Sequence, residues 1–329
     1  MTPVLAVEGL SVRFRTEDGF VHAVDGVSFT VGAGEVLAVV GESGCGKTVT
    51  ALSLVGLLPP SAQVSGHVRL EGEDLVQVPR ARLRELRGKQ VGFVFQEPMT
   101  SLNPVLTVGR QVGEVLRRHE GLSRAAARRR AAELLDLVGI PEAGRRLREY
   151  PHQLSGGLRQ RVVIAIAVAC GPRLLIADEP TTALDVTIQA GILDLLRDLR
   201  HRLGTAIVLI THDLGVVADV ADRVLVMYAG RKVEEAGAED LFAAPQHPYT
   251  VGLLGAVPNP ARHAAGARLR EIPGMVPSLS QRLGFCAFAP RCPRADDRSR
   301  SERPPLEEVR AGHLVACFHP GPEPLGVHQ

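Results

Sequence analysis

Short continuous apolar runs are the most regular pattern in this chain, and they end in small or charged residues. Val36–Val40 leads into a glycine-rich loop, Arg173–Glu179 ends in two carboxylates, and Ala206–Ile210 is apolar throughout. Runs of this length predict buried strands of a parallel sheet whose functional ends are exposed. Leu5–Phe14 and Val24–Val31 alternate between apolar and polar residues and predict further β-structure near the start of the chain.

Helical patterns separate these strands, which predicts the α/β class. A helical run, Thr48–Leu58, follows the glycine-rich loop, and the region from Gln96 to Ser155 is rich in Arg, Ala and Leu. Within it, Arg124–Arg130 interleaves arginine with alanine, as on the solvated face of an amphipathic helix. After about residue 245 prolines accumulate and periodicity is lost, which predicts a boundary and a small irregular domain.

Residues 41–48 read Gly-Glu-Ser-Gly-Cys-Gly-Lys-Thr, a complete phosphate-binding loop between a predicted strand and a predicted helix. Its glycines permit a backbone whose N–H groups point at phosphates, aided by the helix N-terminus. We expect Lys47 to reach the β- and γ-phosphates and the Thr48 hydroxyl to bind Mg²⁺. A glycine turn without a ligand is the alternative, which the complete match disfavours. The expected ATP contacts are Gly41, Glu42, Ser43, Gly44, Cys45, Gly46, Lys47, Thr48 and Val49.

Cys45 lies inside this loop, beside Lys47 and close to the start of the predicted helix. Both features favour the thiolate, so the sequence predicts a reactive thiol whose alkylation blocks ATP binding. A shielded, inert thiol is the alternative.

Asp178 and Glu179 end the run Arg173–Glu179 and are candidates for the hydrolytic chemistry. Asp178 is placed to hold Mg²⁺ through water, and Glu179 is the candidate general base for the attacking water. The alternative is a solvated strand end without a catalytic role, which the phosphate loop earlier in the chain disfavours.

The composition restricts the class of protein. Of 329 residues, 45% are hydrophobic and 22% charged, which is typical of a soluble globular chain with one large domain and a small one. The net charge is +2, from 38 basic and 36 acidic residues, so no electrostatic argument for nucleic-acid binding follows. Five cysteines in this setting argue against a disulfide framework.

The sequence predicts neither a membrane span nor a secretory signal. The longest apolar run, Val162–Cys170, is about half as long as a span, and Glu8 and Arg13 interrupt the N-terminal segment early. We therefore expect a cytosolic protein that reaches a membrane only through partners.

A further motif, Leu154-Ser155-Gly156-Gly157-Leu158-Arg159-Gln160-Arg161, resembles the signature sequence of ATP-binding cassette (ABC) proteins. The surrounding motifs follow the order of such a cassette: the phosphate loop, Gln96, the signature, Asp178-Glu179, Ala183-Leu184-Asp185 and His212. The resemblance covers residues 1 to about 245 and implies an ABC-type P-loop NTPase, with a RecA-like core, an inserted helical subdomain at about 97–171 and an antiparallel β subdomain. Residues 246–329 would then form a small irregular C-terminal extension.

Motifs on both sides of that boundary resemble the peptide-importer ATPases, the dipeptide/oligopeptide/nickel subfamily. Those of the cassette are the segment from Phe95 to Pro104 and the segment from Glu179 to Gln189. Those of the extension are His247-Pro248-Tyr249-Thr250, Ile272-Pro273-Gly274, and Cys286 followed by Pro290-Arg291-Cys292-Pro293. The resemblance therefore spans nearly the whole chain.

The resemblance implies roles for residues outside the phosphate loop. The signature residues Ser155, Gly156, Gly157 and Gln160 would serve the ATP held by an opposing subunit. Gln96 would sense Mg²⁺ and the attacking water, His212 would contact the γ-phosphate and steady Glu179, and Asp185 belongs to the D-loop. Phe14 occupies the place of the aromatic residue that stacks on adenine, with ordinary strand core as the alternative.

Cys286, Cys292 and Cys317 cluster in the extension. Relatives in this subfamily typically carry a fourth cysteine about seven residues after the second, where this chain has Ser299. Four thiolates would suit an iron–sulfur cluster or zinc, but three with a serine, or with His313 or His319, make a weaker site. We expect reduced structural cysteines without metal.

The resemblance implies an ATP-hydrolysing subunit of an importer for di- and oligopeptides, using ATP and Mg²⁺. Its expected partners are a second, non-identical ABC ATPase subunit, two transmembrane permease subunits and an extracytoplasmic solute-binding protein, with no nucleic acid. Its expected place is the cytoplasmic face of the cell membrane, as a peripheral protein. The alternatives are an importer ATPase for nickel or another small solute and, more remotely, a soluble ABC ATPase acting on nucleic acid or ribosomes.

Overall fold

The computed structural model describes residues 2–17, 19–97, 101–182, 184–256, 272–280 and 282–321. The chain forms two compact units, each built from segments far apart in sequence. The first contains the first six residues, Thr30–Val36 and Arg69–Ile210. The second contains Val7–Phe29, Leu37–Val68 and the chain from residue 211 onward, so the phosphate loop and the predicted extension belong to the same unit.

The first unit contains three parallel strands of a larger mixed sheet. Strand β7 (Leu174–Asp178) pairs with β6 (Val91–Val94) on one side and with β8 (Ala206–Ile210) on the other. Every residue of β7 and β8 is buried, as their apolar runs predict. Asp178 pairs with Ile210, so both strands end at the same edge of the sheet.

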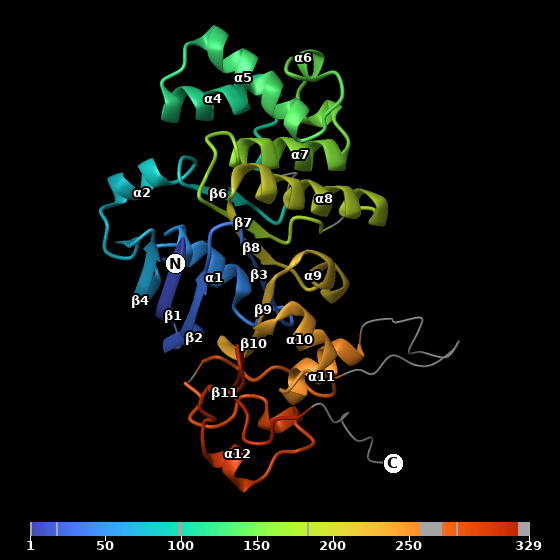
Figure 1. The fold of residues 1–329 in the computed structure, drawn as a ribbon. Helices are drawn as coiled ribbons and strands as arrows, with labels where there is room; N and C mark the ends of the chain where they lie inside the picture. Colours follow the sequence, from blue (N-terminus) through green and yellow to red (C-terminus); the bar gives the residue numbers. More distant parts are fainter. Residues whose placement is uncertain are drawn as a thin grey trace. The chain divides into compact units, whose positions relative to one another are not determined.

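Helices make up most of the rest of the first unit (Figure 1). They are α2 (Arg80–Leu86), α4 (Val108–Glu120), α5 (Arg124–Leu137), α6 (Ala143–Arg146), α7 (Gly156–Ala167) and α8 (Val186–Leu203), with a 3-10 turn at Pro151–Gln153. The short strand β5 (Glu73–Asp74) also belongs here. The arginines of α5 are exposed, whereas Ala127, Ala131, Leu134 and Leu135 are buried. This confirms the predicted amphipathic helix.

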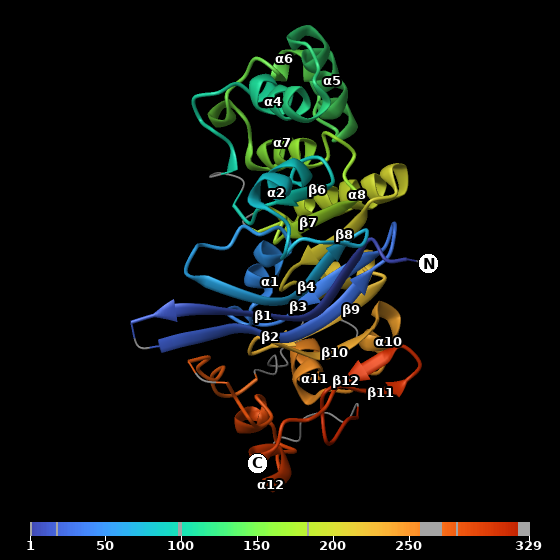
Figure 2. The same cartoon turned by 90° about the vertical axis from the view of Figure 1, so that its left-hand side faces the viewer.

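The second unit contains most of an antiparallel sheet and an extended mixed sheet (Figure 2). Strands β2 (Gly19–Val31), β1 (Leu5–Thr16) and β4 (Ala62–Leu70) lie side by side in that order. Strand β3 (Val36–Val40), which ends at the phosphate loop, pairs in parallel with β9 (Arg223–Tyr228). Helices α1 (Lys47–Leu54), α9 (Leu214–Val220), α10 (Ala238–Ala243) and α11 (Pro248–Gly255) complete this part of the unit.

The extension is less irregular than the sequence predicts. Strand β10 (Arg231–Gly237) pairs antiparallel with β9 and with β12 (His313–Val315), which in turn pairs with β11 (Glu307–Arg310). A 3-10 turn at Ala289–Arg291 and a short helix α12 (Asp297–Ser301) come before β11 and β12 in the chain. Strands of three and four residues are too short to give a visible alternation, which explains why the sequence did not reveal them.

The helix after the phosphate loop is also shorter than predicted. It ends at Leu54 rather than Leu58, and Gly56 then takes a φ of +61°, a conformation that ends helices readily. Among the residues that the structure describes, no helix is both long and apolar enough to cross a membrane.

The extension shares one hydrophobic core with the strands of its unit. Tyr228 of β9 contacts Tyr249 of α11 and Phe288, with ring centroids 4.6 Å and 5.2 Å apart. All three rings are fully buried, and Val40 and Val226 belong to the same cluster. Burying three aromatic side chains supplies much of the apolar contact that a proline-rich segment needs in order to fold.

A buried carboxylate fixes the start of α11. Glu234 accepts hydrogen bonds from the backbone N–H groups of Gln246 and His247 at 2.7 Å and 2.9 Å, and it lies 2.7 Å from His313 Nε2. Burial alone would raise the pKa of Glu234, but the hydrogen bonds from His313 and from the backbone outweigh it and lower the pKa. Glu234 therefore stays ionised and joins β10, β12 and the start of α11.

The adjacent His247 makes the packing of this region sensitive to pH. Its Nδ1 accepts a hydrogen bond from the N–H of Tyr249, and burial lowers its pKa to about 4. Between pH 6.5 and 4 the unfolded chain therefore binds more protons, so this residue makes stability fall as the pH falls. We expect a loss of about 2 kcal/mol between pH 7 and pH 4.5.

Thermal unfolding of the wild type and of His247→Asn at both pH values measures this effect. Asparagine can still cap the helix but cannot titrate, so the variant should keep that part of its stability at pH 4.5. Parallel pH profiles for the two proteins would show that His247 is not responsible.

Candidate functional site

The phosphate loop is tightly packed where it leaves β3. Gly41, Gly44 and Gly46 all have positive φ angles, of 148°, 77° and 101°. A Cβ atom at Gly41 would overlap the backbone oxygen of Met227, and one at Gly46 would overlap the backbone oxygen of Ala23. Glycine is therefore required at positions 41 and 46 by contact with the backbone as well as by conformation.

Lys47 opens α1 and points back along the loop. Its Nζ donates hydrogen bonds to the carbonyl oxygens of Gly41 at 2.7 Å and of Glu42 at 3.0 Å, and only 6% of the residue is exposed. Ser43, Gly44 and Thr48 are exposed beside it, and Val49 is half-buried. A buried ammonium group beneath exposed loop residues, at the start of a helix, suits an anionic ligand such as a triphosphate.

Cys45 does not match the reactive thiol that the sequence favoured. Its side chain is completely buried, and this burial raises the pKa of the thiol despite the nearby charge of Lys47. The loss of solvation outweighs the helix terminus and the lysine, so the alternative of a shielded thiol holds.

Glu179 is held by two side chains of the first unit. It follows β7, and its N–H donates to the carbonyl of Ile210 at 2.8 Å. Its Oε2 accepts hydrogen bonds from Gln96 Nε2 at 3.0 Å and from Thr182 Oγ1 at 2.9 Å. Gln96 and Glu179 therefore meet, although they follow different strands, β6 and β7. The contact with Thr182 was not predicted from the sequence.

The backbone at Glu179 is strained. Its φ is +47°, in the left-handed region that residues other than glycine adopt at a cost of order 1–3 kcal/mol. In this conformation the backbone N–H and the carboxylate of Glu179 are both hydrogen-bonded, to Ile210 and to Gln96 and Thr182. Strain of this kind concentrates at functional sites.

The fit of Mg²⁺ depends on oxygen ligands, and the predicted set supplies them. Asp178 is 2% exposed at the end of β7, Gln96 is exposed, and Thr48 is exposed on α1. A carboxylate, an amide and a hydroxyl are ligands that Mg²⁺ accepts. The residues therefore suit the ion. Asp178 and Gln96 belong to the first unit and Thr48 to the second. Binding of one Mg²⁺ ion by all three residues therefore stays a prediction.

The signature residues begin α7. Ser155 is the N-cap, and its hydroxyl accepts from the N–H of Leu158 at 3.4 Å. Gly156 is exposed, whereas a Cβ at Gly157 would lie 2.7 Å from Ile188 Cγ2 of α8. Gln160 is buried and donates to the carbonyl of Pro180 at 2.7 Å. The signature thus has an exposed serine and glycine at the start of α7, and its Gly157 packs closely against Ile188 of α8.

The remaining predicted residues lie at ends of elements or on the sheet. Asp185 is exposed at the N-cap of α8, and His212 is exposed just after β8. Phe14 is half-buried on β1, so it is not a fully buried core residue. Pro98, Met99, Thr100 and Ala183, which belong to the quoted motifs, lie outside the described residues. The functions assigned to Phe14, Asp185 and His212 stay predictions.

The three cysteines of the extension line one small cavity of about 10 Å³, together with Ser299 and His319. Burial raises the pKa of all three thiols, to about 11 for Cys317. The Ser299 hydroxyl instead completes the N-terminal cap of α12, donating to the carbonyl of Asp296 and accepting from its N–H. Within the described ranges, no group of three or more His, Cys, Asp or Glu residues is arranged to hold a metal ion. These residues do not fit a four-thiolate cluster.

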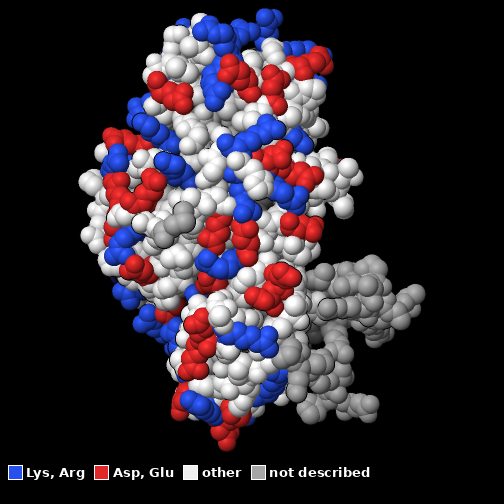
Figure 3. All heavy atoms as spheres, in the orientation of Figure 1, with Lys and Arg blue, Asp and Glu red and all other residues white. Residues whose placement is uncertain are grey.

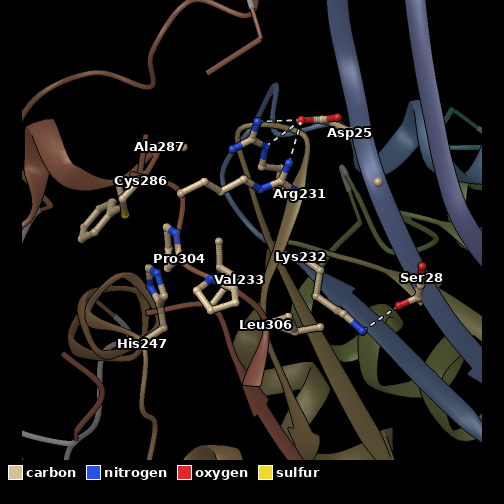
Figure 4. A pocket seen from close by; sticks show the side chains of 15 residues that line it. Asp25, Ser28, Arg231, Lys232, Val233, His247, Cys286, Ala287, Pro304 and Leu306 are labelled. Atoms are coloured by element: carbon tan, nitrogen blue, oxygen red, sulfur yellow. Dashed lines mark hydrogen bonds and ion pairs between the residues drawn. The ribbon is translucent and has the colours of Figure 1, made fainter. Parts of the chain in front are cut away.

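A salt-bridge network connects β2 with β10 and the extension. Asp25, almost fully buried, lies 2.6 Å from Arg231, 2.7 Å from Arg282 and 3.5 Å from Arg303. Burial would raise the pKa of Asp25, but these guanidinium groups, Arg231 first, hold it below its ordinary value. Figure 4 shows Arg231 reaching towards Asp25 at the rim of a cavity of about 320 Å³.

On one face of the described residues, charges of both signs are mixed (Figure 3). On the face drawn in Figure 3, basic and acidic side chains of the described residues are interspersed. This pattern agrees with the near balance of 38 basic and 36 acidic residues.

Two further contacts on the phosphate loop were not found from the sequence. Arg291 forms a bidentate ion pair with Glu42, at 2.7 Å and 3.0 Å, and the Tyr249 hydroxyl accepts from the N–H of Glu42 at 2.7 Å. Both partners stand in motifs quoted above. However, Arg291 and Glu42 are 249 residues apart along the chain, and no local sequence pattern predicts that they form a pair.

Comparisons with known proteins agree with this geometry. The ABC transporter family matches residues 24–182, and the C-terminal region of oligopeptide/dipeptide transporters matches residues 233–298. A probable peptide ABC transporter ATP-binding protein of Sinorhizobium fredii (strain NBRC 101917 / NGR234) is 53% identical over 317 residues, which cover 96% of this chain and 94% of that protein. The oligopeptide transport ATP-binding protein OppD of Salmonella typhimurium (strain LT2) is 50% identical over 322 residues, or 98% and 95% of the two chains.

Solved structures give the same fold. An ATP-binding cassette determined as a dimer in a post-hydrolysis state, bound to ADP and Pi, matches with a TM-score of 0.64 and 29% identity. The match covers 71% of this chain and 98% of that cassette. The predicted ABC-type P-loop fold is confirmed, and the chain belongs to the ABC transporter ATP-binding proteins, with the C-terminal region of the oligopeptide/dipeptide branch.

Proposed function

We propose that this chain hydrolyses ATP to drive a membrane importer of di- and oligopeptides. The observation that carries the hydrolytic part is the position of Glu179 at the end of β7, next to Asp178, with its carboxylate held by Gln96 and Thr182. The peptide cargo is supported by the match of residues 233–298 and by the names of the relatives.

Catalysis here is positioning combined with charge stabilisation. Lys47 and the loop N–H groups bind the β- and γ-phosphates, and Mg²⁺, held by Thr48, Gln96 and Asp178, would neutralise the developing charge. Glu179 accepts a proton from the attacking water, while Gln96 orients the carboxylate through the 3.0 Å hydrogen bond. His212 contacts the γ-phosphate and steadies Glu179 in this proposal.

A second cassette completes each ATP site in this scheme. The exposed start of α7, with Ser155 and Gly156, would contact the ATP bound by the opposing subunit, and Asp185 would contact that subunit at the shared interface. The partner is a related but non-identical ATPase. Two permease subunits and an extracytoplasmic binding protein supply the pathway, and the complex places this chain at the cytoplasmic face of the membrane. Isolated chain should therefore hydrolyse ATP slowly.

Growth experiments test the cargo. A strain that lacks the gene for this chain, and that needs an amino acid supplied as a dipeptide, should grow only when the wild-type chain is restored. The Lys47→Ala chain should fail to restore growth, because it lacks the phosphate-binding ammonium group. Restoration of growth under nickel limitation, but not on dipeptides, would instead assign the chain to a nickel importer.

A further inference from the structure

Three motifs of the extension, none of which the hydrolytic chemistry uses, converge on one residue of the phosphate loop. Tyr249 comes from the His247–Thr250 motif, Arg291 from the Pro290–Pro293 motif, and the carbonyls of Ile272 and Pro273 from the third. Tyr249 and Arg291 contact Glu42 directly, and the two carbonyls accept hydrogen bonds from Arg291.

Arg291 is fully engaged in this arrangement. Its Nη1 and Nη2 donate to the two carboxylate oxygens of Glu42, its Nε to Pro273 O at 2.9 Å, and its Nη2 also to Ile272 O at 3.0 Å. Only 5% of its side chain is exposed, against 27% for Glu42. A planar guanidinium with this many partners allows one geometry only, so it fixes the carboxylate in both position and direction.

Tyr249 fixes the backbone of the same residue. Its hydroxyl accepts the N–H of Glu42 at 2.7 Å, and its ring is completely buried against Tyr228 and Phe288. Burial raises the pKa of Tyr249, so the hydroxyl stays protonated. The extension thus holds both the peptide group and the side chain of residue 42.

Glu42 is also bonded to the lysine of the loop. Its carbonyl oxygen accepts from Lys47 Nζ at 3.0 Å, beside the 2.7 Å bond from the same atom to Gly41 O. A displacement of Glu42 would therefore move an acceptor of Lys47. In addition, an unpaired carboxylate in this loop would repel a triphosphate, and the charge of Arg291 cancels it.

We propose that the extension controls nucleotide binding through this contact, with Arg291 and Tyr249 as positioning residues for the phosphate loop. They hold Glu42 neutralised and oriented, so that Lys47 and the loop N–H groups are set for the triphosphate. By reciprocity, a bound triphosphate stabilises the packing of the extension. The proposal rests on ATP binding by this loop, as in the proposed function, and adds the extension as its regulator.

The dissociation constant of MgATP for the purified full chain tests the proposal. Arg291→Met should weaken binding about 10-fold, because it removes a charge-assisted bidentate pair and leaves the Glu42 carboxylate unpaired. Adding Glu42→Gln to this variant removes the repulsion and should bring affinity back to within roughly 3-fold of the wild type. If the second mutation restores binding, the weak binding of Arg291→Met was not caused by misfolding.

Two further variants provide controls. Tyr249→Phe removes one oxygen atom and should weaken binding by a smaller factor with little change in the fold. Arg303→Met removes an arginine of the same extension that pairs with Asp25, not with the loop, and should leave MgATP affinity unchanged.

Hydrogen exchange on the wild-type chain tests the reciprocal effect without any mutation. Addition of MgATP should slow exchange of the Arg291 and Cys292 amides, which donate to Phe288 and Ala289 within the extension. The inference would be overturned if Arg291→Met bound MgATP as tightly as the wild type and if MgATP did not slow hydrogen exchange in the extension of the wild type. Failure of the wild type to bind MgATP at all would instead contradict the proposed function.

Discussion

Replacing Glu179 by glutamine should reduce ATP hydrolysis by at least about 10²-fold and leave ATP binding intact. Glutamine has the shape of glutamate, so the strained backbone at +47° and the hydrogen bond from Thr182 can persist. It cannot accept a proton from water, however, and the loss falls on the chemical step. Phosphate release by the assembled complex, together with equilibrium binding of MgATP, separates the two effects.

Glu97→Gln is the matched control for this substitution. Glu97 is an exposed acid one residue from Gln96, and the scheme gives it no part in the reaction. Its neutralisation should leave the rate within a factor of about two, because the side chain is exposed and accepts no proton in the reaction. Near-normal hydrolysis by Glu179→Gln would assign the general base to another residue.

Replacing Gly46 by alanine should abolish measurable ATP binding and destabilise the second unit by about 3 kcal/mol or more. The φ of +101° is strained for alanine, and the new Cβ would overlap the backbone oxygen of Ala23, which no side-chain rotation can relieve. The loop must therefore move at the point where α1 begins. Thermal unfolding and binding of a fluorescent ATP analogue measure the two effects.

Gly34→Ala separates the overlap from the conformational strain. Gly34 has a φ of +63°, and a Cβ there would have nothing within 4 Å, so only the strain of about 1 kcal/mol applies. This variant should bind the ATP analogue normally. Equal stability losses at positions 34 and 46 would show that the loop can adapt to the additional atom.

Local patterns predicted the elements that carry the chemistry. The runs that became β3, β7 and β8 are completely buried in the structure, and a run with no polar position is what such burial requires. The phosphate loop was recognisable because its glycines and lysine are close neighbours in sequence. Glu179 was found from the end of its apolar run and Gln96 through a resemblance, and the structure places Gln96 Nε2 3.0 Å from Glu179 Oε2.

Contacts between distant segments could not be predicted in this way. No local signal pairs Glu42 with Arg291 or gives Glu179 a positive φ, because both depend on segments that pack together only in the folded unit. Cys45 was misjudged for the same reason. Its neighbours in sequence favour a thiolate, but the burial that raises its pKa comes from tertiary packing.

Peptide uptake into proteoliposomes tests the central claim most directly. The chain would be reconstituted with its second ATPase, permeases and binding protein, and supplied on the cytoplasmic side with MgATP and on the other with a labelled dipeptide or oligopeptide. The account predicts uptake that requires MgATP and that is lost with Glu179→Gln, although the complex still assembles. Uptake that continues undiminished with this variant, or an intact complex that hydrolyses ATP without moving any peptide, would contradict it.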